Sequence, residues 1–235
     1  MSALAGSLKD RQFGLFLITS IAFLSVPALA HAISDANAQF VETIDGPAIA
    51  VFMYLGAKHM FTGVDHLLFL LGVIFFLYRL RDVVLYVSIF TLGHSATLLL
   101  GVLSNFGVNP QIVDAIIGIS VVFKAFDNLN GFKTLFGFQP NIKIAIFVFG
   151  LFHGLGLATK LQEILTSNNG LWTNLISFNV GVEIGQIAAL SLVIGLLTIW
   201  RKTNWFQQTS TVMNGGIMCA GFILTTYHLI GYWYT

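Results

Sequence analysis

The sequence is poor in charged residues, in cysteine and in proline. Only 9% of its 235 residues are charged and 56% are hydrophobic, whereas soluble domains carry about 25% charged residues. A single cysteine, Cys219, excludes an internal disulfide and a cysteine-rich metal site. A net charge of +1 provides no basic field for nucleic acid. These scarcities predict an integral membrane protein that does not bind nucleic acid.

The N-terminal segment, residues 1–32, has the pattern of a secretory signal peptide. A short charged start precedes an apolar stretch at 13–26, and small residues before position 33 offer a cleavage site. The alternative is a retained anchor helix. We expect residues 33–235 to form one transmembrane helical domain.

Long apolar stretches in the rest of the chain predict a polytopic, all-α bundle. A membrane span needs roughly 20 apolar residues, and six segments are candidates: 63–80, 83–104, 111–127, 141–160, 173–199 and 212–234. The preceding stretch, 47–61, is too short to span and carries Pro47 and Gly56. It predicts a half-helix that re-enters the membrane or lies at its surface.

Basic residues gather in alternate loops between these predicted spans. One set of loops holds Arg79, Arg81, Lys133, Lys143, Arg201 and Lys202, and the other set holds only Lys58 and Lys160. Because basic loops stay in the cytoplasm, the pattern predicts that both ends of the mature chain lie outside.

Ionisable side chains within the apolar segments are the candidate functional residues, because such groups are costly in a membrane. The predicted topology places them in the outer half of the bilayer or near its midplane. The candidate metal ligands are His59, Asp65, His66, His94, His153, Glu183 and His228. Ser95, Asn179 and Gln186 are candidate supporting partners. Gly154, Gly181 and Gly185 predict close helix packing beside them.

Imidazole and carboxylate ligands suit divalent metals such as nickel, cobalt, zinc and iron, and the absence of nearby thiols disfavours copper(I). Three functions fit such a set. The residues could pass a metal ion across the membrane. Alternatively, they could hold a permanent catalytic zinc with an open position, as in an intramembrane metal-dependent hydrolase, or belong to an accessory protein that assembles a metal site. The third hypothesis is a structural subunit whose histidines only join helices by hydrogen bonds.

Four motifs, each in a different predicted span, resemble the HupE/UreJ family of bacterial membrane proteins. They are Gly63–Phe69, Phe90–Leu98, Phe149–Ala158 and Phe178–Gln186. The spacing from His59 to Asp65 and His66 also resembles the family's His-x5-Asp-His signature. The classical permeases of the family carry a second histidine-rich motif, for which this chain has only His153. The sequence therefore resembles the second, less characterised branch of the family.

The resemblance implies a permease for nickel or cobalt in the bacterial inner membrane, with both mature termini in the periplasm. It also implies candidate partners in the maturation systems of hydrogenase and urease, which need nickel. The motif positions would give His59, Asp65, His66, His94, His153 and Glu183 the metal-binding roles. On this hypothesis nickel or cobalt is the substrate, whereas an enzyme would hold zinc as its cofactor.

Overall fold

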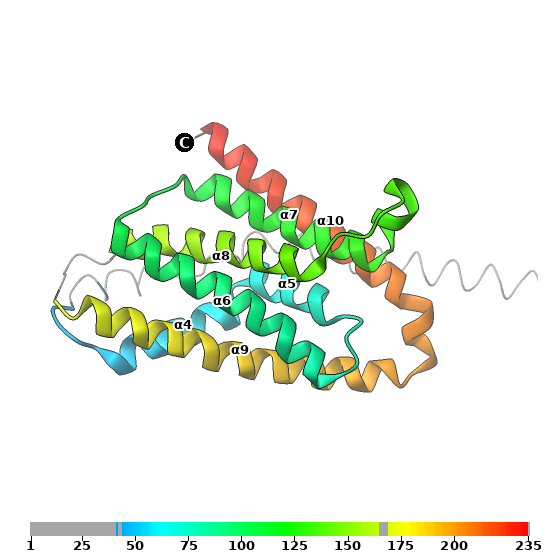
Figure 1. The fold of residues 1–235 in the computed structure, drawn as a ribbon, viewed down its shortest axis with the longest axis horizontal. Coiled ribbons are helices and arrows are strands. Elements are labelled where there is room, and N and C mark those ends of the chain that lie inside the picture. Colours follow the sequence, from blue (N-terminus) through cyan, green and yellow to red (C-terminus); the bar gives the residue numbers. More distant parts are fainter. Residues whose placement is uncertain (1–40, 42–43, 165–168, 235) are drawn as a thin grey trace, which may run out of the picture.

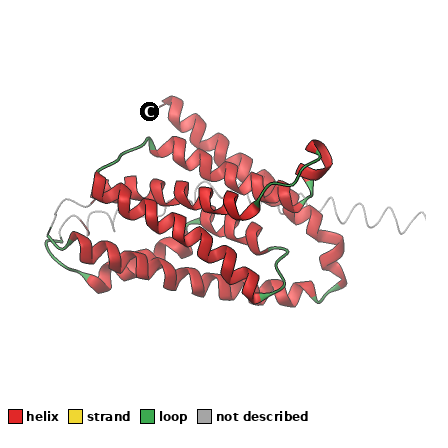
Figure 2. Ribbon diagram, in the orientation of Figure 1, coloured by secondary structure: helices red, strands yellow, loops and turns green. Residues whose placement is uncertain are grey.

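The computed structural model describes residue 41 and residues 44–164 and 169–234, and within these ranges the chain is helical without strands (Figure 2). The all-α prediction is confirmed. The predicted signal segment, 1–32, lies outside the described residues. The helices are α4 (Ile49–Thr62), α5 (Val64–Ile74), α6 (Leu80–Ser104), α7 (Pro110–Asn128), the π-helical η1 (Phe132–Phe136), α8 (Ile142–Ile164), α9 (Leu171–Arg201) and α10 (Asn204–Tyr234).

Most of the long helices lie side by side in three close pairs: α4 with α9, α6 with α8, and α7 with α10 (Figure 1). Glycine makes the close approach possible in each pair. A Cβ atom added at Gly154 would lie 2.0 Å from the carbonyl oxygen of His94, and one at Gly181 would lie 2.0 Å from that of Met53. In the third pair, a Cβ at Gly118 would lie 2.7 Å from the backbone nitrogen of Thr225.

The close packing predicted for three glycines is confirmed. Gly181 and Gly185 of α9 face Met53 and Ala57 of α4, and Gly154 of α8 faces the backbone of α6 at His94. Without a side chain, each glycine lets two helix backbones touch, which replaces the hydrophobic driving force that lipid does not supply. The glycines thus fix which helices are neighbours.

A broken helix forms the first part of the described bundle. α4 and α5 are separated only by Gly63 and bend by 64°. Asn174, near the start of α9, bonds to the backbone of Gly46 and Ala48 just before α4. At the other end, Arg201 closes α9 and donates to carbonyls at the end of α5. The two half-helices together therefore run the full length of α9.

This path corrects the predicted first span at 63–80, because α5 ends at Ile74 and is too short to cross alone. With 14 and 11 residues, the half-helices measure roughly 21 and 17 Å, against a hydrocarbon core of roughly 30 Å. The half-helix predicted at 47–61 is confirmed as α4. It is joined to α5 through Gly63, and a pair bent by 64° has the geometry of either a broken span or a re-entrant loop.

Among the described residues, three helices are long and apolar enough to cross a membrane, namely α6, α8 and α9, and the bent pair α4–α5 is a fourth candidate. α7 falls short because it carries three charged residues, Asp114, Lys124 and Asp127. α10 falls short as well, because polar side chains occur in both of its halves. The chain is a multi-pass membrane protein, and the count of six spans stays a prediction.

The loops rich in basic residues share one end of the bundle. The Nδ2 atom of Asn128, at the end of α7, donates to Gly72 of α5 and to Asn214 of α10. Arg201, at the end of α9, reaches the carbonyls of Ile74, Phe75 and Leu77. The clustering matches the predicted alternation of loops, and the side of the membrane on which this end lies stays a prediction.

Candidate metal centre

The break at Gly63 brings two histidines together. His59 lies in the last turn of α4 and His66 in the first turn of α5, and their ring centroids are 4.8 Å apart. A Cβ at residue 63 would lie 2.9 Å from the carbonyl oxygen of His59 and 3.1 Å from Nδ1 of His66. A glycine is therefore needed at the corner, because any side chain there would push the two imidazoles apart.

A third histidine comes from α6. His94 has its ring centroid 5.7 Å from that of His66 and 6.5 Å from that of His59. One ligand nitrogen from each of the three rings lies within 4.8 Å of the other two. All three side chains are buried. The three rings thus form a compact cluster, called here the histidine triad: His59, His66 and His94.

His153 of α8 extends the triad to a fourth ring, 4.6 Å from His66 between centroids. Its Nε2 lies 3.2 Å from Oγ of Ser120 on α7. The single hydroxyl proton of Ser120 goes to the carbonyl oxygen of Ile117, so the serine oxygen accepts from Nε2–H of His153. In the neutral ring this leaves Nδ1 as the nitrogen with a free lone pair.

Asp65 sets the orientation of His66 in the same way. Its Oδ1 lies 3.1 Å from Nδ1 of His66, and its side chain is only 18% exposed. A carboxylate that accepts from Nδ1–H leaves Nε2 free to bind, as in the carboxylate–histidine–metal arrangement common at metal sites. Asp65 therefore supports a ligand in this geometry without itself belonging to the triad.

The buried nitrogens fit a metal ion. Six ring nitrogens of the four histidines have no hydrogen-bond partner among the described residues: both of His59, both of His94, Nε2 of His66 and Nδ1 of His153. An unsatisfied buried polar group costs about 1–3 kcal/mol. Two nitrogens on one metal ion lie at most about 4.2 Å apart, twice a bond of about 2.1 Å. A contraction of the triad by about half an ångström would satisfy that limit.

Glu183 lies elsewhere. Its side chain is exposed on α9, where it lines a surface cavity of about 540 Å³ together with Thr91 and Gln186. Glu183 is two residues from both Gly181 and Gly185, which is about 200° around a helix. Because the glycines face α4, the carboxylate points away from the interior, and the structure does not bring it into the triad.

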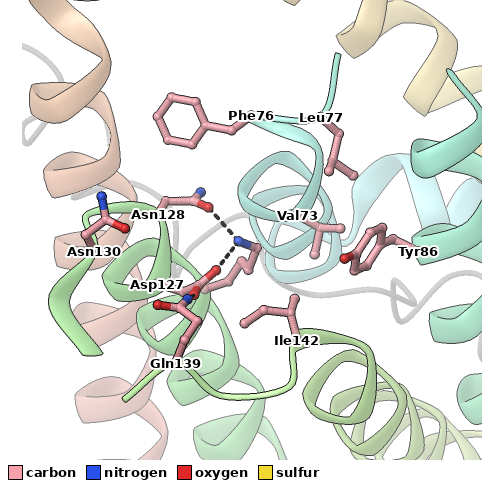
Figure 3. A pocket seen from close by; sticks show the side chains of 10 residues that line it. Val73, Phe76, Leu77, Tyr86, Asp127, Asn128, Asn130, Gln139 and Ile142 are labelled. Atoms are coloured by element: carbon pink, nitrogen blue, oxygen red, sulfur yellow. Dashed lines mark hydrogen bonds and ion pairs between the residues drawn. The ribbon is translucent and has the colours of Figure 1, made fainter. Parts of the chain in front are cut away.

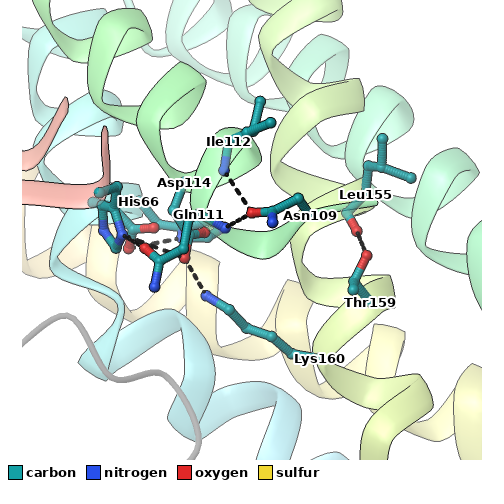
Figure 4. Close-up of polar contacts among 10 residues, drawn as sticks. His66, Asn109, Gln111, Ile112, Asp114, Leu155, Thr159 and Lys160 are labelled. Carbon is teal, nitrogen blue, oxygen red and sulfur yellow. Dashed lines mark hydrogen bonds and ion pairs between the residues drawn. The ribbon is translucent and has the colours of Figure 1, made fainter. Parts of the chain in front are cut away.

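His228 belongs to a second polar cluster at the end of the bundle where α7 begins. Figure 4 labels its other members, Gln111, Asp114 and Lys160. Nδ1 of His228 lies 2.9 Å from Oε1 of Gln111 and 3.9 Å from Oδ2 of Asp114. Lys160 of α8 donates to the same Asp114 oxygen at 2.8 Å. The structure thus places His228 with an ion pair that joins three helices, outside the triad.

The predicted supporting residues have other partners. Gln186 is buried and accepts a 2.8 Å hydrogen bond from Thr91 Oγ1, and Asn179 donates to Leu175 within its own helix. Ser95 is half-buried next to His94 in the chain. Ser120, which does support a histidine, was missed by the sequence analysis because a lone serine in an apolar helix carries no signal.

The HupE / UreJ protein family model matches residues 35–235 of the chain. The chain belongs to the HupE/UreJ family. No curated protein and no solved structure matches it. The match covers every described helix, so the triad, Asp65 and His153 all lie within the part of the chain that defines membership.

Proposed function

We propose that this HupE/UreJ protein is a membrane permease for a divalent transition metal ion, nickel or cobalt, which the histidine triad binds in transit. The observation that carries the proposal is the set of six buried ring nitrogens without partners. In an apolar bundle such nitrogens are costly, and imidazole is a favoured ligand of these metals. Permeases of nickel and cobalt are described in the family, which supports transport over a structural role.

The position of the triad suits a transported ion, which must be bound reversibly. His59 and His66 flank the break between two half-helices, and broken helices are a common way for transporters to build a substrate site at mid-membrane depth. The ligands are neutral imidazoles without thiolates. Conduction requires binding that is strong enough for entry and weak enough for release, and three neutral ligands meet that need better than a charged cage would.

The direct test is uptake of cobalt or nickel into proteoliposomes. We expect His59→Ala and His94→Ala to abolish both cobalt uptake and cobalt binding to the triad, because each removes one triad ligand. His228→Ala is the matched control, since it removes a membrane histidine outside the triad. Equal loss in the control would contradict the assignment, as would full uptake by either triad variant. Activation of nickel-dependent hydrogenase or urease in cells would then test the implied partners.

A zinc-dependent hydrolase is the second candidate, because three histidines with an open fourth position are also the ligand set of a catalytic zinc site. Asp65 would then act on the metal through His66, whose Nδ1 it holds. Elemental mass spectrometry of the purified protein separates the two. Near-stoichiometric zinc that survives chelator washing and disappears in His94→Ala would favour the hydrolase. Little retained metal, with cobalt or nickel bound again on addition, would favour the permease.

A further inference from the structure

A buried cation lies inside the bundle near the end where α5 and α7 terminate. Nζ of Lys124 donates to Oδ2 of Asp127 at 2.6 Å and to Oδ1 of Asn128 at 2.5 Å. The lysine and aspartate side chains are 9% and 8% exposed. Gln139 donates to the second oxygen of Asp127. An ammonium group is thus enclosed by oxygen ligands in a region that is otherwise apolar.

This ion pair borders a cavity of about 450 Å³ (Figure 3). The lining combines the polar groups of Lys124, Asp127, Asn128, Asn130 and Gln139 with the side chains of Val73, Phe76, Leu77, Tyr86 and Ile142. The volume exceeds that of several water molecules, at about 30 Å³ each. A lysine side chain therefore has room to swing aside, and water has room to complete the coordination of an ion.

One face of α7 connects this cavity with the histidines. Ser120, Lys124 and Asp127 are all buried, and their spacing of four and then three residues places them on the same face of the helix. Ser120 contacts His153, so the lysine lies one turn, about 6 Å, further along. Between the two levels Phe69 is fully buried and packs on His153, with ring centroids 5.3 Å apart.

We propose that Asp127 and Asn128 form a second, oxygen-lined cation site on the exit side of the triad, and that Lys124 is a tethered cation that fills this site until the metal ion displaces it. The inference rests on the proposed transport function. The triad receives the ion, Phe69 separates the two levels, and the oxygen site holds the ion before it enters the cavity.

The dimensions favour this exchange. Two oxygens already lie at 2.5 and 2.6 Å from Nζ, about half an ångström beyond the roughly 2.0–2.2 Å bonds that a first-row divalent ion such as zinc makes to carboxylate oxygen. An ion at the position of Nζ would thus need little movement of either ligand. Oxygen ligands bind nickel and cobalt more weakly than imidazole does, which suits the last site before release. The aliphatic part of Lys124 packs against Gly72 of α5, whose added Cβ would lie 3.3 Å from Cγ of the lysine. A movement of Lys124 would therefore change its packing against α5.

The site is tested by counting bound cobalt in a His94→Ala background, where the triad is disabled. We expect Lys124→Met to add one cobalt ion per chain over His94→Ala alone, because the carboxylate loses its own cation. Adding Asp127→Asn should remove that ion again. The proposal is wrong if the folded His94→Ala/Lys124→Met protein, verified by gel filtration and circular dichroism, gains no cobalt. A gain that persists with Asp127→Asn would also contradict it.

Lys124→Arg provides a second test that keeps the charge and the fold. A guanidinium holds a carboxylate through two hydrogen bonds and should be displaced less readily. We expect cobalt uptake to fall at least tenfold while cobalt binding to the triad is unchanged. Wild-type uptake in this variant would overturn the exchange. The Lys124→Met/Asp127→Asn protein with an intact triad separates the two hypotheses, because loss of cobalt binding there would count against the permease itself.

Discussion

Asp65 determines which nitrogen His66 presents, because the carboxylate accepts from Nδ1–H and leaves Nε2 free. Partners of this kind typically contribute 10–100-fold to metal affinity. We therefore expect Asp65→Asn to weaken cobalt binding by about 10–100-fold, whereas removal of a ligand such as His94 should abolish it. Isothermal titration of the detergent-solubilised variants measures both. Binding equal to wild type in Asp65→Asn would show that the His66 ring is held by its packing alone.

At the scale of single residues, the sequence predicts that four histidines gather in one place, and the structure brings them together. It also predicts that Glu183 joins them, and the structure does not bring it there. The predicted topology places His66, His94 and His153 in the same half of the bilayer, and the spacing to His66 adds His59. Depth carries no information on the direction in which a side chain points around its helix. For α9 that direction follows from Gly181 and Gly185, which dock on α4 and turn Glu183 outward.

Glycine contacts between paired helices are the strongest constraint at the scale of elements. We expect Gly154→Ala to destabilise the bundle by about 1–3 kcal/mol, the usual cost of overpacking, because the new Cβ would lie 2.0 Å from a carbonyl oxygen of α6. Gly195→Ala is the matched control, since no atom lies within 4 Å of its added Cβ. Thermal melting in detergent compares the two. A similar loss in both variants would show that the contact at Gly154 is not the cause, since Gly→Ala by itself raises helix propensity.

Arg201 links the end of α9 to the end of α5 by donating to three carbonyls, those of Ile74, Phe75 and Leu77. Helix ends leave carbonyls without partners, so Arg201→Ala should loosen the last turn of α5. We expect faster amide hydrogen exchange in residues 70–78, measured by mass spectrometry, and no change in the neighbouring variant Lys202→Ala. Unchanged exchange in Arg201→Ala would mean that α5 is held by its side-chain packing.

At this scale hydropathy predicts where most helices lie, but it does not predict where α5 ends. The apolar stretches located the later helices to within a few residues for most boundaries. Around Gly63 the predicted boundaries at 61 and 63 match the break between α4 and α5. The apolar run beyond Ile74 is what misleads, because it extends the predicted span to residue 80. The end of α5 comes from geometry instead, namely the cap on its last carbonyls by Arg201.

At the scale of the whole molecule, metal binding should raise the free energy of unfolding. A ligand that binds only the folded state stabilises it by about 2.7 kcal/mol at a free concentration of 100 times its Kd. We expect saturating cobalt to raise the melting temperature of the wild-type protein and to leave that of His94→Ala unchanged. Calcium, which prefers oxygen ligands, is the control ion. An equal rise with calcium, or a rise in His94→Ala, would place the stabilising ion outside the triad.

The histidines of the triad come from different helix pairs. His59 belongs to the α4–α9 pair, His94 and His153 belong to the α6–α8 pair, and His66 stands on the short α5 between them. Each pair is locked internally by its glycines, so the freedom that remains lies in the joints between pairs. A metal ion bound to the triad would cross-link the α4–α9 pair, the α6–α8 pair and α5 through its three histidine ligands. The metal-bound protein would then be more rigid than the metal-free protein. A neighbouring protein that binds the rigid state more tightly would respond to the metal ion without contacting it.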